Sequence, residues 1–260
     1  MDDSLADRVA IVTGGATLIG RGVCQVLSDR GAEVVAADID SVGLADLAEP
    51  IVTSETDITD DAALVALVEE TVERFGRLDI IVNLAATYLD NGSATSRADW
   101  LSGLDVNLVS GIRLVEVARP HLAAHGVGAV VNFTSISAGA AQTGRWVYPA
   151  SKAAIAQVTR SQALDLAPQR IRVNSVSPGW TWSAIMDNLS GGDIEKTDRV
   201  AADFHITGRV GRPNEVGEVV AFLASDAASV VTGADWAADG GYSALGPEQK
   251  SETIPLLAAD

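Results

Sequence analysis

The sequence of 260 residues is poor in several residue types, and each shortage limits what the protein can be. Its single cysteine, Cys24, cannot form an internal disulfide and is expected to pack in the core. No apolar run approaches the ~18 residues of a membrane span, and the acidic N-terminus lacks the apolar stretch of a signal peptide. We therefore expect a cytoplasmic protein that is not inserted in a membrane.

Basic residues and histidines are also scarce, which narrows the range of ligands. Lys and Arg number 18 against 35 Asp and Glu, for a formal net charge of −17. A surface of that sign repels nucleic-acid phosphates and anionic headgroups, so neither nucleic acid nor membrane is an expected partner. His121 and His125 lack a third metal ligand, so we expect no metal site. His205 is expected to be a solvated loop residue.

Apolar residues, in contrast, are plentiful enough for a large core. They make up 47% of the chain, which favours a single folded domain over residues 1–260. Strand-like runs at 8–12, 33–38, 79–85, 129–134, 171–176 and 234–239 alternate with helix-like segments at 20–30, 60–75, 97–122, 149–167 and 213–225. This alternation is typical of a parallel sheet with helices on both faces. We predict a doubly wound α/β fold, with a substrate lid near 183–210.

The first apolar run leads into TGGATLIGRG at residues 13–22, an order of strand, glycine turn and helix that suits a dinucleotide phosphate. Gly14 and Gly20 allow the tight turn and the close helix contact, and the helix N-terminus can receive the pyrophosphate. Leu18 stands where such turns commonly have glycine. We predict ordinary backbone angles for Leu18, with its side chain directed away from the phosphates toward the cleft or lid.

An acidic residue determines which cofactor is expected. Asp38 follows Gly20 by 18 positions, at the end of the second apolar run, where it can accept hydrogen bonds from an adenosine ribose. Its carboxylate would repel the 2′-phosphate of NADP, and neither 15–17 nor Ala37 supplies a basic residue to offset it. We therefore predict NAD. The alternative is a tight turn beside an ordinary surface aspartate.

Three residues between 135 and 152 have the spacing of an acid/base group. Tyr148 and Lys152 are four positions apart, on one face of a helix, and Ser135 precedes Tyr148 by 13 positions. A nearby ammonium favours the phenolate and lowers the pKa of a phenol from ~10 toward neutrality. We therefore expect Tyr148 to exchange a proton near neutral pH.

With these residues established, the chain resembles the short-chain dehydrogenase/reductase family over nearly its whole length. The shared motifs are Thr13-Gly14-x-x-x-x-x-Gly20, Asp57-Ile58, Asn83-Leu84-Ala85-Ala86, Asn107, Ser135, Tyr148-x-x-x-Lys152, Pro178-Gly179 and Asp239-Gly240-Gly241. The resemblance implies a single-domain Rossmann-type sheet of about seven strands. It also implies a homo-oligomer, a dimer or a tetramer, paired through the helices at 97–122 and 149–167.

The resemblance further implies roles for individual residues. Tyr148 would be the acid/base, Ser135 would hydrogen-bond the reacting oxygen, and Lys152 would bind the nicotinamide ribose and tune Tyr148. Asn107 would hold a water in a proton relay. The residues expected to bind NAD are Gly14, Thr17, Leu18, Ile19, Gly20, Asp38, Asp57, Ile58, Asn83, Ala85, Tyr148, Lys152, Pro178, Gly179, Thr181 and Ser183.

The substrate is expected to meet aromatic, apolar and small polar side chains. The candidates are Tyr88, Ser137, Trp146, Trp180, Trp182 and Met186. Such a wall suits a hydrophobic or cyclic secondary alcohol better than a highly charged substrate. We predict an NAD-dependent oxidoreductase that interconverts a secondary alcohol and a ketone. The alternatives are an NADPH-dependent ketoreductase acting on a 3-oxoacyl thioester, and a non-catalytic dinucleotide sensor of the same fold.

Overall fold

A parallel sheet of seven strands forms the centre of the computed structural model, which describes residues 4–247, 250–251 and 255. The strand order is β3-β2-β1-β4-β5-β6-β7. The strands are β1 (Val9–Thr13), β2 (Glu33–Asp38), β3 (Val52–Glu55), β4 (Ile80–Asn83), β5 (Ala129–Phe133), β6 (Arg172–Pro178) and β7 (Asp235–Ala238). The chain winds outward from β1 in both directions, so the predicted doubly wound fold is confirmed. In such a sheet, ligands bind beyond the carboxyl ends of the strands at the reversal point.

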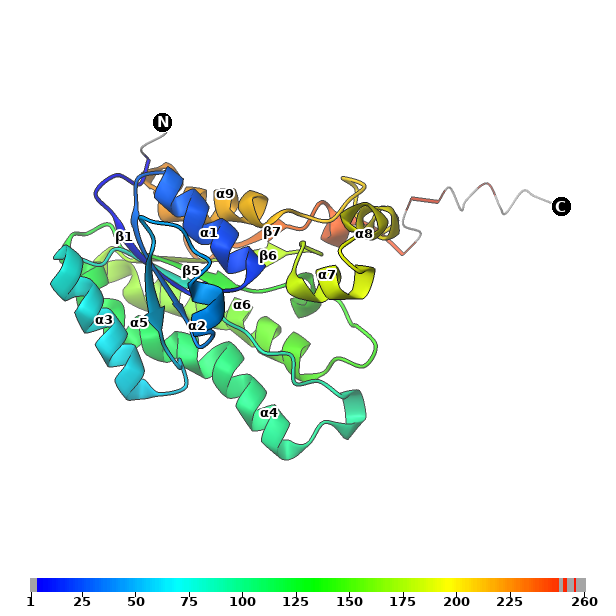
Figure 1. Cartoon of the computed structure of the whole chain (residues 1–260), viewed down its shortest axis with the longest axis horizontal. Helices are drawn as coiled ribbons and strands as arrows, with labels where there is room; N and C mark the ends of the chain where they lie inside the picture. The colour runs from blue at the N-terminus through cyan, green and yellow to red at the C-terminus, as the bar shows by residue number, and fades with distance from the viewer. Residues whose placement is uncertain (1–3, 248–249, 252–254, 256–260) are drawn as a thin grey trace.

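Helices cover both faces of this sheet (Figure 1). On one face lie α1 (Leu18–Asp29) and α9 (Pro213–Ala224), and on the other lie α3 (Asp61–Phe75), α5 (Ser110–Ala124) and α6 (Val147–Leu166). Each face has its own apolar core, to which the central strands contribute alternate side chains. β1 and β5 are buried along their whole length, which explains why they stand out as apolar runs in the sequence.

Helix ends follow the local sequence signals. The Asp60 carboxylate caps α3 by accepting from the Ala62 N–H, and Gly76 ends that helix in the left-handed conformation. Pro213 occupies the first turn of α9, where its missing N–H costs nothing. Cys24 lies on the buried face of α1, so its predicted place in the core is confirmed, and burial raises the pKa of its thiol to about 12.

Two elements differ from the periodicity of the sequence. β3 is absent from the apolar runs because it is an edge strand whose side chains alternate between exposed and half-buried. The helix expected over 97–122 is divided into α4 (Arg97–Leu104), a π-helical turn (Asp105–Val109) and α5. Such a turn inserts one extra residue into the helical repeat and often occurs at functional sites.

The long segment between β6 and α9 contains two further helices, α7 (Ala184–Ser190) and α8 (Ile194–Ala201). Its base is closed by a bridge between Thr181 and Gly211. A short helix, α2 (Ser41–Leu44), follows β2 on the opposite side of the carboxyl edge. Among the described residues, no helix combines the length and apolarity needed to cross a membrane.

Candidate active site

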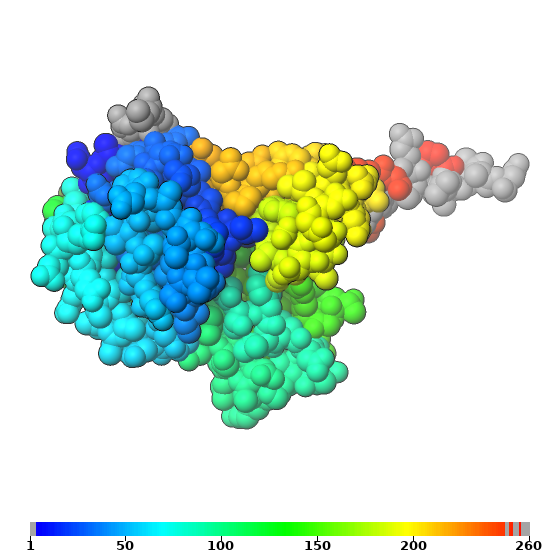
Figure 2. Space-filling model, in the orientation of Figure 1, coloured from blue at the N-terminus to red at the C-terminus, as the bar shows by residue number. Residues whose placement is uncertain are grey.

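A large cleft opens at the carboxyl edge of the sheet and has two chemically different ends. The glycine-turn end is lined by Ala16, Thr17, Leu18, Ile19, Arg21, Asp38 and Asp40. The tyrosine end is lined by Tyr88, Ser135, Ser137, Gln142, Arg145, Tyr148 and Lys152, with side chains of α7 and α8 as its outer wall. In the space-filling view, the yellow segment that includes α7 and α8 lies beside the blue N-terminal segment (Figure 2).

At the glycine-turn end, two glycines are required by close backbone contacts. A Cβ on Gly20 would lie 2.1 Å from the carbonyl oxygen of Gly14. Gly14 itself has a φ of +75°, and a Cβ there would lie 2.8 Å from the backbone nitrogen of Ala85. The turn therefore brings β1 and the start of α1 closer than any larger residue permits.

Leu18 does not disturb this turn. Thr17 caps α1 by accepting from the Gly20 N–H at 3.0 Å, and Leu18 is the first helical residue. Among the described non-glycine residues only Asp7 and Arg170 have positive φ, so the prediction of ordinary backbone angles at Leu18 is confirmed. Leu18 also lines the cleft, as predicted.

Backbone groups hold the Asp38 carboxylate beside the glycine turn. Its two oxygens accept from the N–H groups of Ala16 and Asp40, each at 3.0 Å. Arg21 lines the same end, which sequence reasoning missed because this arginine lies beyond the glycine turn. Its guanidinium donates to the carbonyl oxygens of Ala16 and Gly43, each at 2.8 Å, and pairs with Asp46 at 3.0 Å. The positive charge of Arg21 is therefore already paired with the Asp46 carboxylate.

At the tyrosine end, α6 carries Tyr148 and Lys152 on one face, as their spacing predicts. The Lys152 ammonium donates to the carbonyl oxygen of Phe133 at 2.8 Å and lies 5.4 Å from the centroid of the Tyr148 ring. Complete burial lowers the pKa of Lys152 to about 8. Lys152 thus retains its proton at neutral pH, but less firmly than a surface lysine.

Ser135 follows β5 and faces the same space. Its hydroxyl accepts from the Ser137 N–H at 3.1 Å and donates to the Ser137 hydroxyl at 3.2 Å. Ser137 in turn donates to the Gln142 side chain at 2.8 Å. Because Ser137 holds Ser135 through two contacts, the orientation of Ser135 is fixed before any substrate arrives.

The phenol of Tyr148 does not have the pKa that the sequence suggests. Burial raises its pKa above the ordinary value, and Tyr88, stacked on the Tyr148 ring at a centroid distance of 4.6 Å, raises it further. Ser135 and Arg145 oppose these effects without reversing them. The expected pKa of Tyr148 near neutrality is therefore wrong for this arrangement, because burial outweighs the effect of neighbouring charges.

Asn107 lies in the π-helical turn and binds the loop that follows β4. Its side-chain oxygen accepts from the Thr87 N–H at 2.7 Å, and its amide nitrogen donates to the Thr87 carbonyl at 3.0 Å and to the Ser151 hydroxyl at 3.3 Å. Asn107 therefore ties this loop to α6 at Ser151, the residue before Lys152. Its place in a water relay stays a prediction.

Asp90 was not identified from the sequence, yet it fixes the start of α6. Its carboxylate accepts from the N–H groups of Trp146, Val147 and Tyr148 at 2.7 to 2.9 Å. Burial opposes ionisation, but these three donors and nearby Arg145 hold the pKa of Asp90 below its ordinary value. A local sequence pattern could not predict this contact, because Asp90 is 56 to 58 residues away from the residues that it binds.

His205 is also placed differently from expectation. It is fully buried rather than solvated, so that prediction is wrong. Its Nε2 accepts from the Trp180 N–H at 3.2 Å, while Nδ1 lies 3.1 Å from the carbonyl oxygen of Ala201 at the end of α8. The ring also has edge contacts with Trp180 and Tyr242. His205 thus joins α8 to the turn after Pro178.

The remaining predicted residues divide into two groups. Those that line the cleft are Thr17, Leu18, Ile19, Asp38, Pro178, Gly179, Thr181 and Ser183 for the cofactor, and Tyr88, Ser137, Trp180 and Met186 for the substrate. Those outside its lining are Gly14, Gly20, Asp57, Ile58, Asn83, Ala85, Trp146 and Trp182. The assigned roles of both groups stay predictions.

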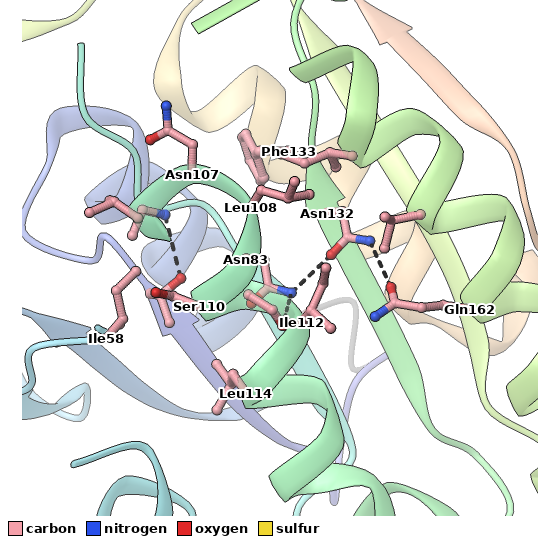
Figure 3. Close-up of a pocket in the computed structure, with 16 residues that line it drawn as sticks. Ile58, Asn83, Asn107, Leu108, Ser110, Ile112, Leu114, Asn132, Phe133 and Gln162 are labelled. Atoms are coloured by element: carbon pink, nitrogen blue, oxygen red, sulfur yellow. Dashed lines mark hydrogen bonds between the residues drawn. The ribbon is translucent and has the colours of Figure 1, made fainter. Parts of the chain in front are cut away.

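Asn83 illustrates the second group, because its side chain lies in a separate small pocket (Figure 3). The amide nitrogen donates to the Asn132 side-chain oxygen at 2.9 Å, and Asn132 donates to Gln162 at 3.3 Å. The side-chain oxygen of Asn83 is buried and has no hydrogen-bond partner among the described residues. The polar network therefore links β4 and β5 to α6 rather than opening into the cleft.

A glycine turn with a fixed acidic residue at one end of the cleft, and serine, tyrosine and lysine at the other, define a dinucleotide-dependent oxidoreductase. Comparison with known proteins agrees. A family model described as enoyl-(acyl carrier protein) reductase matches residues 14–243. The chain belongs to the short-chain dehydrogenase/reductase family.

Individual relatives span almost the full chain. It is 38% identical to cis-4-hydroxycyclohexanecarboxylate dehydrogenase of Sinomonas cyclohexanicum, over 94% of this chain and 100% of the relative. It is 32% identical to 3-oxoacyl-[acyl-carrier-protein] reductase FabG of Thermotoga maritima, over 91% and 98%. The ligand-free structure of aldohexose dehydrogenase from Thermoplasma acidophilum superimposes with a TM-score of 0.88 at 30% identity, over 97% and 100%. The predicted activity class, alcohol dehydrogenase and ketone reductase, is confirmed.

Proposed function

We propose that the protein oxidises the secondary alcohol of a cyclic substrate to a ketone, with NAD as the electron acceptor. The observation that carries this proposal is the tyrosine end itself, where Ser135 and Tyr148 face a wall of α7 and α8. That wall presents Ile185, Met186, Leu189 and Val200, which offer apolar contacts to a ring. Two of the similar proteins act on ring alcohols by name, a hydroxycyclohexanecarboxylate and an aldohexose.

Each residue of the tyrosine end has a task in this reaction. Ser135, still held by the Ser137 N–H, would turn its hydroxyl proton from the Ser137 hydroxyl to the carbinol oxygen and stabilise its developing charge. Tyr148 would accept the hydroxyl proton as the oxygen becomes a carbonyl. Lys152 would hold the ribose hydroxyls beside the reacting carbon, and its ammonium, 5.4 Å from the centroid of the Tyr148 ring, would offset part of the cost of ionising the buried phenol. Asp90, by fixing the first turn of α6, would keep Tyr148 in place.

The glycine-turn end fits a nicotinamide dinucleotide, which supplies the hydride acceptor when bound. The tight turn at Gly14 and Gly20 leaves the N-terminus of α1 open to a pyrophosphate. The Asp38 carboxylate is held by two N–H groups, so it can accept from ribose hydroxyls and would repel a 2′-phosphate. Because Arg21 is already paired with Asp46, it offers that phosphate little compensation. These contacts support NAD over NADP and the oxidative direction.

The test is a spectrophotometric screen for NADH and NADPH formation. Substrates are cyclohexanol, 4-hydroxycyclohexanecarboxylate, hexoses and open-chain secondary alcohols, each with NAD and with NADP; acetoacetyl thioesters are assayed with NADH and NADPH. We expect the highest kcat/KM with ring alcohols and NAD. Faster turnover of the thioesters with NADPH would overturn the proposal in favour of a ketoreductase. No turnover of any class, with NAD binding intact, would favour a sensor.

We also propose that two copies pair through α5 and α6. The support is exposed apolar surface along this side, where Leu164 on α6 is 76% exposed and Val109, just before α5, is 43% exposed. Light scattering on the purified protein tests this: a dimer or tetramer is expected, and Leu164→Asp should shift the mass toward the monomer. An unchanged monomeric mass in both proteins would contradict it.

A further inference from the structure

The sign of the charge changes from one end of the cleft to the other. The formal net charge of the chain is −17. Yet the carboxylates that line the cleft, Asp38 and Asp40, both belong to the glycine-turn end, while Arg145 and Lys196 line the tyrosine end. Among the described residues, no carboxylate lines the tyrosine end. A substrate that enters there meets positive charge on a protein that is otherwise acidic.

The other two cationic side chains that line the cleft, Arg21 and Lys152, already bind groups of the protein. Arg21 is bound to two carbonyl oxygens and to Asp46, and Lys152 is buried against the carbonyl oxygen of Phe133. Arg145 and Lys196, in contrast, form no side-chain ion pair within residues 4–247. They are the cleft cations whose donors stay available to a ligand.

Arg145 lies close to the reacting group. Its guanidinium carbon is 5.8 Å from the centroid of the Tyr88 ring, and that ring stacks on Tyr148. Its charge also helps to lower the pKa of Asp90 and opposes the rise in the pKa of Tyr148, so its field reaches both groups. The Asp90 carboxylate is already used by three backbone N–H groups at the start of α6. Among the residues that the structure describes, Arg145 is therefore a cation beside the acid/base with no ion-pair partner.

We propose that Arg145 binds a carboxylate carried on the ring of the substrate, with Lys196 of α8 adding positive charge from the outer wall. This inference rests on the proposed oxidation of a ring alcohol. A planar guanidinium donates two parallel hydrogen bonds to a carboxylate, a geometry that a lysine ammonium cannot match. The substrate class is thus a cyclic secondary alcohol with an anionic substituent across the ring from the hydroxyl.

The position of Arg145 favours a carboxylate on a ring over the phosphate of a long thioester carrier as its ligand. The Arg145 guanidinium carbon lies 5.8 Å from the centroid of the Tyr88 ring, which stacks on Tyr148, so an anion bound by Arg145 would lie close to the reacting group. A phosphate at the far end of a thioester arm would lie well outside the tyrosine end. Charge near the reaction centre therefore favours a compact anion.

The first experiment compares a charged and a neutral substrate of equal shape. The purified enzyme is assayed with NAD on 4-hydroxycyclohexanecarboxylate and on its primary amide. Because Arg145 is exposed and exposed ion pairs contribute about 0.2–1 kcal/mol, we expect the wild type to prefer the carboxylate in kcat/KM by about 2- to 5-fold. In Arg145→Gln this ratio should fall by about the same factor, while Arg145→Lys should keep part of it. Arg97→Gln, which removes one charge from exposed Arg97 on α4, is the matched control and should leave the ratio unchanged.

A second experiment does not depend on turnover. Calorimetry on the enzyme saturated with NADH measures binding of cyclohexanecarboxylate and cyclohexanecarboxamide, neither of which can react. Tighter binding of the carboxylate, lost in Arg145→Gln and weakened by salt, supports the inference. Equal turnover and equal binding of acid and amide would overturn it while leaving the proposed function intact. Turnover of open-chain alcohols alone, with carboxylate binding retained, would refute the proposed ring substrate instead.

Discussion

At the glycine-turn end of the cleft, backbone groups hold the Asp38 carboxylate, whereas at the tyrosine end side chains also help to hold Ser135 and Tyr148. Asp38 is held by two N–H groups, and a Cβ on Gly20 would clash with the Gly14 carbonyl. Ser135, in contrast, is oriented through Ser137, and Tyr148 through the distant carboxylate of Asp90. Backbone contacts suit the cofactor, which is the same for every substrate. Side chains at the substrate end can be substituted to suit a different substrate. The two ends should therefore respond differently to substitution.

The largest effect is expected at the tyrosine end. Tyr148→Phe removes the proton acceptor but keeps the ring that stacks on Tyr88. General acid/base catalysis contributes about 10²- to 10⁴-fold, so kcat should fall by that factor. Fluorescence titration should show NADH binding within about twofold of wild type, because a hydroxyl contributes little to binding compared with the glycine turn.

Two results would contradict the assignment of proton transfer to Tyr148 and of cofactor binding to the glycine turn. Loss of NADH binding together with activity would mean that Tyr148 mainly supports the cofactor. Near-normal kcat would show that a different group accepts the proton, and Tyr88→Phe would then be the variant to examine.

A smaller but more specific effect is expected at the glycine-turn end. Asp38→Ala removes the like charge that meets a 2′-phosphate, so the ratio of kcat/KM for NAD to that for NADP should fall at least tenfold, or about 1.4 kcal/mol. Initial rates with both cofactors on one alcohol give the ratio. Asp165→Asn, on the exposed side of α6, is the control. An unchanged ratio in Asp38→Ala would place the discrimination elsewhere, with Arg21 as the next residue to test.

The two ends also differ in the space available for an added side chain. Substituting alanine for one glycine at each end tests this difference. Gly20→Ala places a Cβ 2.1 Å from a backbone oxygen, whereas a Cβ on Gly139, near the tyrosine end, meets nothing within 4 Å. Overpacking costs about 1–3 kcal/mol, so Gly20→Ala should lower Tm by several degrees and weaken NADH binding. Gly139→Ala should change Tm by less than about 1 °C. Equal Tm values for the two variants would mean that α1 moves away at little cost.

The same contrast explains how much could be read from the sequence. The glycine turn and Asp38 were predictable because backbone geometry demands glycine and local spacing places the acid. Tyr148 and Lys152 were predictable because a helix brings residues four apart together. Asp90 was not, because its partners lie more than 50 residues away and only the tertiary fold brings them together. Arg145 looks like any surface arginine until the cleft shows which cations are already paired.

Errors in the sequence interpretation have equally local causes. β3 was missing from the apolar runs because half of its side chains face solvent at the sheet edge. His205 looked solvated because its segment is polar, yet α8 and the turn after Pro178 enclose it. The pKa of Tyr148 was expected to be low because charge is visible in a sequence while burial is not.

The smallest expected effect concerns Lys152, whose ammonium is buried in the active site at a cost in folding stability. Its pKa is about 8 in the folded protein against 10.5 for an ordinary lysine. Between these values the unfolded chain binds more protons, so the free energy of unfolding rises with pH from about 8 to 10.5. Below pH 8 the full cost of burying the charge is present. Lys152→Met removes that cost but loses the hydrogen bond to Phe133, so at pH 7 a net gain of about 1 kcal/mol, or a few degrees in Tm, is expected.

Thermal unfolding of Lys152→Met and wild type at several pH values checks this prediction. The advantage of the variant should shrink as pH rises from 8 toward 10.5, because the wild-type lysine then loses its proton in the fold. Lys196→Met, at an exposed position on α8, should show no such dependence. A variant less stable than wild type by a constant amount at every pH would mean that the pKa of Lys152 does not fall on folding and that its bond to Phe133 stabilises the protein.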